Sequence, residues 1–429
     1  LHALLEDCLK AQVQEEPSLI VIEDLHWIDA LSLDLLEQLA KALVNHAVCF
    51  MMAYRPPEME RLQVPRLVAL PQFTRVELHE LTAAEAESAI RAKLAQLYPA
   101  RGGTLPEGLL DALMARAQGN PFYLEELLNY VHDRGLDPGD LNRIELPDSL
   151  HTLILSRIDQ LSEQEKTTLR IASIIGRLFR ARWLTGYYPK LGSFPEVKAA
   201  LDALDSLDIT PMVSPEPELA YLFKHIVTHE VTYKSLPFAT RARLHEHLAR
   251  YLENQIEAGA AQGFPLLDMI AYHYLRSEKT EKQREYLRRA GEAAQKKFAN
   301  DAALEYYGTL LPLLKDLVEK TQIHLKHGEV LELMGRWDEA EGDFRAALDS
   351  ARDDTVLKSG AQFALGKLNR LRGDYESALD WLARAEEART ALEDTIGLAE
   401  VLIETGTVMW RKGDYDKARE PLTKGLELA

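Results

Sequence analysis

The stretch Gly366-Lys367-Leu368-Asn369-Arg370-Leu371-Arg372-Gly373-Asp374-Tyr375-Glu376-Ser377-Ala378 decides the fold of the C-terminal part of the chain. It holds two glycines seven residues apart, an aromatic residue two positions after the second glycine, and an alanine three positions later. The same spacing recurs twice, after a degenerate first version. These copies are Gly328, Gly335, Trp337 and Ala340; Gly406, Gly413, Tyr415 and Ala418; and, degenerate, Gly291, Phe298, Asn300 and Ala303. A period of 37 to 40 residues indicates a repeat architecture.

The spacing predicts paired antiparallel helices. The first glycine lets the two helices of a pair approach closely, the second marks the turn between them, the aromatic residue wedges between helices, and the alanine admits the next helix. One pair buries too little surface to be stable alone, so the pairs stack into a solenoid. The pattern resembles tetratricopeptide (TPR) repeats, in a variant longer than the usual period of about 34 residues. We therefore expect an all-α, TPR-like array over 264–429 that binds a protein partner.

The first region, 1–145, alternates apolar runs with helical patterns. The run 19–22 fits a strand buried on both faces of a parallel sheet, the leucines over 31–43 have helical spacing, and 48–53 is a second buried strand. Strand, helix and strand in this order predict a parallel βαβ unit. A further strand is expected at 75–78. Asn120 and Pro121 have the residue types of a helix N-cap and a first helical position.

The second region, 146–260, is helical with one hairpin signal. Ser162 and Glu165 form a capping-box pattern. The segments 212–214 and 219–223 flank Pro215-Glu216-Pro217-Glu218, which predicts strand, turn and strand. Helices with such a hairpin are the layout of a winged-helix domain. The basic and histidine residues over 241–250 are read as one solvated helix face. A DNA-binding use of the domain is the less favoured alternative.

Composition excludes several classes of function. The chain has 68 acidic and 50 basic residues, a formal charge of −18, and no apolar run near the roughly 20 residues of a membrane span. The acidic excess argues against general binding to nucleic acid or to an anionic membrane. Two cysteines make no disulfide framework, so a cytoplasmic location is expected.

Glu23 and Asp24 close the first predicted strand and are the first candidate for chemistry. The carboxyl edge of a parallel sheet is where α/β folds bind ligands. One carboxylate there would hold Mg²⁺ through water while the other orients an attacking water, as phosphoryl transfer requires. The alternative is a loop pair that caps the next helix.

The segment Leu19-Ile20-Val21-Ile22-Glu23-Asp24-Leu25-His26-Trp27-Ile28-Asp29 resembles the Walker B segment of STAND-type P-loop ATPases, signalling proteins close to the AAA+ class. Three further motifs follow in the family's order. Phe50–Pro56 resembles the sensor-1 strand, with Arg55 at the position that contacts the terminal phosphate. Gly119-Asn120-Pro121-Phe122 resembles the GxP motif, whose proline packs near adenine. Phe223-Lys224-His225 resembles the winged-helix segment whose histidine senses the diphosphate.

The resemblance implies binding of ATP or ADP with Mg²⁺. It implies catalytic roles for Glu23, Asp24 and Arg55, with the two acids also at the metal, and cofactor contacts for Gly119, Pro121 and His225. Each residue also has an ordinary interpretation. Arg55 could form a surface salt bridge, Pro121 could only start a helix, and His225 could be a partly buried, satisfied histidine. His26 and Trp27 are interpreted as packing residues.

Two departures from the family bear on activity. Glu23 stands where many P-loop ATPases have Asp, which lengthens the reach to the metal and puts efficient hydrolysis in doubt. No Gly-x-x-x-x-Gly-Lys-Ser/Thr loop, which cradles phosphates, occurs in the chain. In the family this loop precedes Walker B, so we expect it upstream of Leu1 in a longer polypeptide. ATPase activity is accordingly an expectation for the intact parent.

The fold expected is therefore α/β, a partial P-loop core with its helical lid, followed by a winged helix and a TPR solenoid. The function expected is a nucleotide-dependent signalling switch with a partner-sensing array. The sequence Glu-Asp-Leu-His-Trp in the Walker B segment favours a parent with a class III adenylate/guanylate cyclase domain. LuxR-type regulators contain similar ATPase and TPR segments. Nucleotide-dependent oligomerisation stays open. The alternatives are a nucleotide-free TPR scaffold and a DNA-binding regulator.

Overall fold

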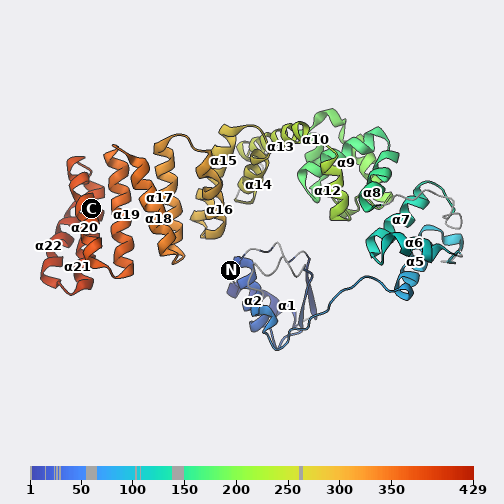
Figure 1. Ribbon diagram of the computed structural model, residues 1–429, viewed down its shortest axis with the longest axis horizontal. Coiled ribbons are helices and arrows are strands. Elements are labelled where there is room, and N and C mark those ends of the chain that lie inside the picture. The colour runs from blue at the N-terminus through green and yellow to red at the C-terminus, as the bar shows by residue number, and fades with distance from the viewer. Residues whose placement is uncertain are drawn as a thin grey trace. The chain divides into compact units, whose positions relative to one another are not determined.

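The computed structural model describes residues 2–14, 16–23, 25, 28, 30–54, 65–101, 104–106, 108–137, 149–259 and 264–429. The chain divides into two compact units, Leu1–Thr82 and Ala83–Ala429 (Figure 1). Helices predominate, and two small sheets accompany them. The boundaries expected at 145/146 and 260/264 stay predictions.

The first unit contains the predicted strand–helix–strand order. Strand β1 (Ser18–Ile22) pairs in parallel with β2 (Val48–Met52), in a register that aligns Ile20 with Phe50. Helix α2 (Ala30–Ala42) connects the two strands. Helix α1 (His2–Gln12) precedes β1, and α4 (Pro65–Val68) follows β2. The parallel pairing is confirmed.

Only one face of this sheet is covered by described residues, whereas the sequence predicted two. Ile22, Phe50 and Met52 belong to a small core with Leu25 and Leu36. The opposite face is open, with Leu19, Val21 and Met51 all more than half exposed. The strand expected at 75–78 was also wrong. No backbone hydrogen bond joins this stretch to another described segment, and Val76 and Leu78 lie in solvent, so it has no partner strand to pair with.

The second unit begins with α5 (Ala83–Leu97), the 3₁₀ turn Pro99–Arg101, α6 (Leu109–Ala117) and α7 (Pro121–Asp133). Gly119 connects α6 to α7 with a φ of +79°, a backbone conformation that favours glycine. The Asn120 side chain accepts a hydrogen bond from the Tyr123 N–H at 3.0 Å, and Pro121 occupies the first turn. The predicted helix start at Asn120 and Pro121 is confirmed.

Helices and a three-stranded antiparallel sheet follow, in the order α8 (Leu150–Gln160), α9 (Glu163–Ile175), β3 (Leu178–Arg180), α10 (Ala181–Tyr187), 3₁₀ turn Pro189–Leu191, α11 (Phe194–Ser206), β4 (Met212–Ser214), β5 (Ala220–Leu222), α12 (Ile226–Lys234) and α13 (Phe238–Glu257). The sheet order is β3-β5-β4, which confirms the predicted hairpin of β4 and β5. The capping box of Ser162 and Glu165 is present. Tyr221 and Phe223 are fully buried in the core of this part.

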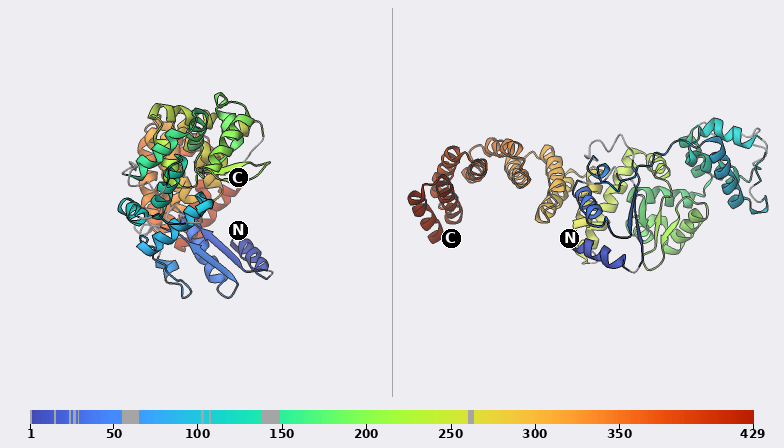
Figure 2. Two further views of the ribbon diagram at one scale, coloured as in Figure 1. Left: turned by 90° about the vertical axis from the view of Figure 1, so that its right-hand side faces the viewer. Right: turned by 90° about the horizontal axis from the view of Figure 1, so that it is seen from below.

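The remaining chain consists of helices that stack in antiparallel pairs (Figure 2). They are α14 (Phe264–Leu275), α15 (Thr280–Lys296), α16 (Asn300–Leu310), 3₁₀ turn Leu311–Leu313, α17 (Leu317–Leu333), α18 (Trp337–Ala351), α19 (Thr355–Arg372), α20 (Tyr375–Ala391), α21 (Thr395–Lys412) and α22 (Tyr415–Leu428). Each pair packs on the next, as a solenoid requires.

The first glycine of each repeat receives a large side chain from the second helix of the same pair. A Cβ atom at Gly366 would lie 2.7 Å from Leu382 Cγ, and one at Gly328 would lie 2.5 Å from a ring carbon of Phe344. Gly406 faces Leu422, and Gly291 faces Tyr307, in the same way. The predicted close approach is confirmed at the first glycine of each copy, and the residue 16 positions after the glycine makes the contact.

The aromatic residue of the pattern packs between helices at Tyr375 but not in the other two complete copies. Tyr375 is partly buried against a core that contains Leu382 and Val401. Trp337 and Tyr415 also begin the second helix of their pairs, but they are 38% and 65% exposed. The pattern alanines are the buried residues, at Ala303, Ala340, Ala378 and Ala418.

The second glycine of each complete copy turns the chain between helices in the left-handed region. The φ angles are +74° at Gly335, +82° at Gly373 and +93° at Gly413. In the degenerate copy Phe298 occupies this position with a φ of +58° and is largely exposed. A side chain with a Cβ is strained there by about 1–2 kcal/mol.

Ion pairs join the first helices of successive repeats. Lys326 of α17 pairs with Glu292 of α15, and Lys367 of α19 pairs with Glu332 of α17 at 2.8 Å. Arg370 of α19 continues the series with Glu404 of α21. These pairs form a charged ladder along α15, α17, α19 and α21.

Candidate functional site

Two of the predicted motifs, about 100 residues apart in sequence, meet in the second unit. The Gly119-Asn120-Pro121-Phe122 motif starts α7, and Phe223-Lys224-His225 leads from β5 into α12. The rings of Phe122 and His225 are in contact, with centroids 3.9 Å apart and planes tilted by 36°. The structure therefore places the motif that contains Gly119 and Pro121 next to the motif that contains His225, through Phe122.

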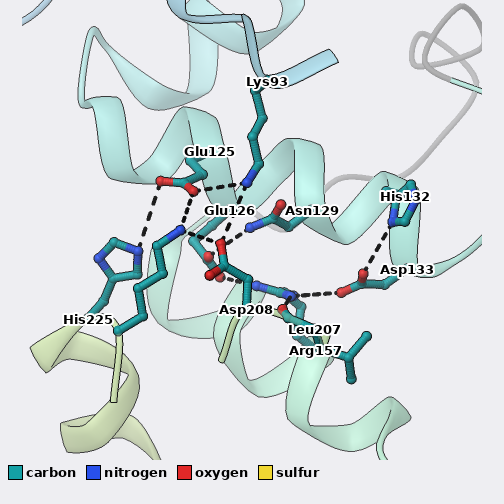
Figure 3. A network of polar contacts seen from close by, with 11 residues as sticks. Lys93, Glu125, Glu126, Asn129, His132, Asp133, Arg157, Leu207, Asp208 and His225 are labelled. Atoms are coloured by element: carbon teal, nitrogen blue, oxygen red, sulfur yellow. Dashed lines mark hydrogen bonds and ion pairs between the residues drawn. The ribbon is translucent and has the colours of Figure 1, made fainter. Parts of the chain in front are cut away.

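Charged groups from four segments lie beside His225 (Figure 3). Glu125 of α7 accepts hydrogen bonds from Lys93 of α5 at 3.0 Å and from Lys224 at 2.6 Å. Lys224 also pairs with Asp208, which follows α11, and Lys93 lies 3.7 Å from the same carboxylate. Partial burial raises the pKa of Glu125, but the hydrogen bonds from the two lysines outweigh it and lower that pKa overall. Glu125 is therefore an ionised group held between two cations.

His225 lies at the edge of this cluster as a neutral ring. Its side chain is about a quarter exposed, and burial is the main cause that lowers its pKa. The Nε2 atom is buried and forms no hydrogen bond with any described residue. Glu125 Oε2 lies 3.9 Å away, beyond hydrogen-bonding distance. The interpretation of His225 as a satisfied histidine therefore does not hold at Nε2.

A second, more buried network lies beside the first and fixes α7 against α8. The Arg157 guanidinium of α8 donates to Glu126 at 2.7 Å, to Asp133 at 2.9 Å and to the Leu207 carbonyl at 3.0 Å. Burial disfavours the charged guanidinium, but the charges of Glu126 and Asp133 outweigh this and raise the pKa of Arg157. Leu207 immediately precedes Asp208, so both networks meet at the end of α11.

A pocket of about 320 Å³ opens between α5 and α7 next to this cluster. Its apolar lining residues are Ala89, Ile90, Ala92, Pro121 and Leu128. Its polar lining residues are Lys93, Gln96 and Glu125. A mostly apolar lining with a few polar groups is typical of small-molecule sites.

The other predicted site lies in the first unit and is only partly described. Glu23 follows β1 at the carboxyl end of the strand and is exposed. Asp24 and Arg55, with His26 and Trp27, lie outside the described residues, so their predicted roles stay predictions. A depression of about 400 Å³ lies at the amino ends of both strands, opposite Glu23. Among the described residues, no group of three or more His, Cys, Asp or Glu could hold a metal ion.

Helix α13 presents only part of the solvated basic face expected over 241–250. Arg243 and Arg250 are exposed, but His245 is buried, and its Nδ1 lies 2.8 Å from Nδ1 of His273 in α14. Its Nε2 lies 2.9 Å from the Tyr233 hydroxyl. The apolar spacing of α13 places position 245 on its inner side, between Leu244 and Leu248. Glu246 pairs with Arg250, so an acidic residue accompanies the basic ones.

Sequence reasoning missed Lys93, Glu125, Glu126, Arg157 and Asp208. Glu126 could have been recognised from the sequence, because it is an acidic residue on the apolar stripe of α7. In the structure it is only 3% exposed. A buried acid of this kind needs a cationic partner. The partner itself, 31 residues away on another helix, has no local signature in a single sequence.

The tetratricopeptide repeat family model matches residues 320–391 and 359–429. The TPR array predicted for the C-terminal part is thus confirmed over this stretch. An uncharacterised protein of Rhizobium meliloti (strain 1021) is 26% identical over 252 residues, which are 58% of this chain and 23% of that protein. The chain therefore matches less than a quarter of the length of this relative. No helix among the described residues is both long and apolar enough to span a membrane.

Solved structures with similar features include three helical proteins. A Signal Transduction ATPase with Numerous Domains (STAND) protein with a tetratricopeptide repeat sensor from Pyrococcus horikoshii is 14% identical, with a TM-score of 0.35, covering 97% of this chain and 75% of that one. MamA from Desulfovibrio magneticus RS-1 is 19% identical, with a TM-score of 0.34 and coverage of 44% and 94%. Aspartyl phosphate phosphatase F from Bacillus subtilis is 11% identical, with a TM-score of 0.37 and coverage of 82% and 76%. Similarity at this level does not define the function.

Proposed function

We propose that this chain carries the transmitting and sensing parts of a nucleotide-controlled signalling switch of the STAND type. The observation that carries the proposal is the contact between the Pro121 motif and the His225 motif. The two motifs were identified independently in the sequence, and nothing in their identification required their side chains to be in contact. A nucleotide-binding site assembled from both motifs does require that meeting.

The surroundings of the contact fit a nucleotide. The pocket beside Pro121 has apolar lining residues that suit a flat base, and Lys93 is one of its polar lining residues. His225 has a buried Nε2 atom without a hydrogen-bond partner among the described residues. When bound, ADP or ATP would supply the phosphate charge to which these residues respond. Pro121 would contact the base, and His225 and the lysines would bind phosphate oxygens.

The part from α8 to α13 is proposed to act as a winged helix that links the site to the TPR array. His225 starts α12, and α13 contacts α14 through the His245–His273 pair. Glu253 of α13 also accepts hydrogen bonds from Tyr274 and Tyr286, at 2.5 and 2.9 Å. A movement at His225 would therefore reach α14 and α15 through packed helices.

The TPR array is proposed to bind the protein partner whose presence the switch reports. Arrays of stacked helix pairs present extended surfaces, and the repeats here contain few residues that suggest chemistry. The output domain stays a proposal, with an adenylate/guanylate cyclase favoured over a LuxR-type regulator. DNA binding is less favoured because α13 carries Glu246 among its basic residues and His245 is buried.

The test compares ADP and ATP binding by the complete parent polypeptide and by its His225→Ala variant. We expect the variant to lose ADP affinity more than ATP affinity, because a ligand shifts a two-state equilibrium only through differential affinity. His151→Ala is the matched control, since His151 is an exposed histidine on α8 away from the contact. Equal affinities for both nucleotides in all three proteins would refute the switch. Absence of any nucleotide binding would leave the TPR scaffold as the function.

A further inference from the structure

A carboxylate occupies the position between Lys93 and Lys224 where a phosphate oxygen would fit. One oxygen of Glu125 accepts from both ammonium groups. Asp208 pairs with Lys224 and lies 3.7 Å from Lys93, so a second carboxylate also faces both lysines (Figure 3). Charge-assisted bonds from converging cations to one anionic oxygen are the usual means of phosphate binding. The Glu125 and Lys224 side chains are each about a quarter exposed, whereas Lys93 is 10% exposed, so an anion from solvent reaches the site from the Lys224 side.

The unsatisfied nitrogen of His225 is an independent sign of a ligand. Buried polar atoms in native proteins almost always have a partner, and an exception calls for a missing group. Nε2 of His225 faces Glu125 Oε2 across 3.9 Å, a gap that the carboxylate does not close. A phosphate group is larger than a carboxylate and carries more oxygens. In the place of the carboxylate it could reach both lysines and the histidine.

We infer that Lys93 and Lys224 form a phosphate-binding site that Glu125 fills as an internal counter-ion, and that phosphate binding displaces Glu125. The ligand chemistry is a phosphate or diphosphate group, free or part of a nucleotide. The nucleotide as source rests on the proposed function. The site itself rests on the described contacts alone.

Displacement would loosen one of the two polar contacts that hold α7. Glu125 connects α7 to Lys224, next to α12, so its release frees α7 on that side. The Arg157 network is more buried, with Arg157 only 5% exposed, and would keep α7 attached to α8. Phosphate binding would thus remove the polar link from α7 to Lys93 and Lys224, while Arg157 keeps α7 attached to α8.

The experiment measures binding of inorganic diphosphate and of ADP to the 429-residue chain by titration calorimetry at constant ionic strength. In Glu125→Gln the neutral amide no longer competes with diphosphate for the lysines. Diphosphate should therefore bind about tenfold tighter or more, which corresponds to the loss of one hydrogen bond between a lysine and the Glu125 carboxylate. Glu125→Gln combined with Lys224→Gln should remove the gain. Glu163→Gln is the charge-matched control, because Glu163 is 85% exposed and pairs with Lys166 within α9.

A second measurement uses the unaltered chain, in case Glu125→Gln does not fold. Diphosphate should protect Lys93 and Lys224 from reductive methylation, whereas Lys198, which pairs with Asp202 on α11, should react at an unchanged rate. Equal diphosphate affinity of folded Glu125→Gln and the unaltered chain, or unchanged reactivity of both lysines, would overturn the inference. If diphosphate behaves as expected but the complete parent polypeptide binds neither ADP nor ATP, the phosphate site stands and the proposed nucleotide function fails.

Discussion

Replacing Gly366 by Ala tests the contact that holds each helix pair together. The new Cβ would lie 2.7 and 2.9 Å from Leu382 side-chain carbons and 3.3 Å from the Ala378 carbonyl oxygen. Leu382 is fully buried, so it has no room to turn away, and α19 and α20 must separate. Overpacking of this kind costs about 1–3 kcal/mol, while the higher helix propensity of Ala returns about 1 kcal/mol. We expect a net loss of about 0–2 kcal/mol.

Gly342→Ala is the matched control. Gly342 lies inside α18, is exposed, and has nothing within 4 Å of the position that a Cβ atom would take. There the same substitution brings only the propensity gain of about 1 kcal/mol. The two variants should therefore differ by the overpacking cost of about 1–3 kcal/mol, with Gly366→Ala the less stable, although both replace a helical glycine by alanine.

Native-state hydrogen exchange of the α19 and α20 amides gives the local free energy of opening, which suits a chain with several parts. Leu382→Ala should cost about 2–5 kcal/mol alone, and it removes the side chain that the methyl group introduced by Gly366→Ala would strike. The double variant should therefore be more stable than the sum of the single losses predicts, by at least about 1 kcal/mol. If Gly366→Ala is as stable as Gly342→Ala, the close approach does not determine the packing of the pair.

Three further predictions concern the buried histidines, the degenerate repeat and nucleotide affinity. Burial, with the nearby Arg276, lowers the pKa of His245 to about 4 and that of His273 to about 3. Both histidines therefore stay neutral in the folded chain, whereas in the unfolded chain they take up protons below about pH 6.5. The free energy of unfolding should then fall as pH drops from about 6.5 towards 4, by up to about 1.4 kcal/mol per pH unit for each histidine. Urea unfolding of the double variant His245→Gln/His273→Gln should show a smaller decrease over the same pH range. Phe298→Gly should stabilise the chain by about 0.5–1 kcal/mol because it removes a side chain from a left-handed position, whereas Phe298→Ala should not; thermal unfolding distinguishes the two. The 429 residues should bind ATP only weakly because they contain no phosphate-cradling glycine loop, and sub-micromolar affinity in titration calorimetry would contradict this.

Features that depend on neighbouring residues could be predicted from the sequence. The turn glycines, the caps at Asn120 and Ser162 and the β4–β5 hairpin each require particular residue types within a few positions. The parallel pairing of β1 and β2 followed from the length of the connection between them. The expected strand at 75–78 failed because an apolar alternation does not supply a partner strand.

Contacts between distant segments could not be predicted in the same way. The repeat pattern revealed the glycines but not the residue that fills each space, because Tyr307, Phe344, Leu382 and Leu422 differ in type and share only their position. Lys224 stood inside a quoted motif, yet its partner Glu125 lies 99 residues earlier. A single sequence contains no signal that connects a surface lysine with one of 68 acids.

The charged ladder along α15, α17, α19 and α21 gives the array a mechanical property. Each rung joins two neighbouring repeats across their first helices, so bending the array lengthens or shortens the rungs while the glycine contacts inside each pair are unaffected. Salt screens exposed charges over a Debye length of about 8 Å at physiological ionic strength, and it screens buried pairs much less. Lys326 and Glu292 are about a third exposed, whereas Arg370 and Glu404 are 11% and 15% exposed. Added salt should therefore make the array bend more easily between α15 and α17 than between α19 and α21.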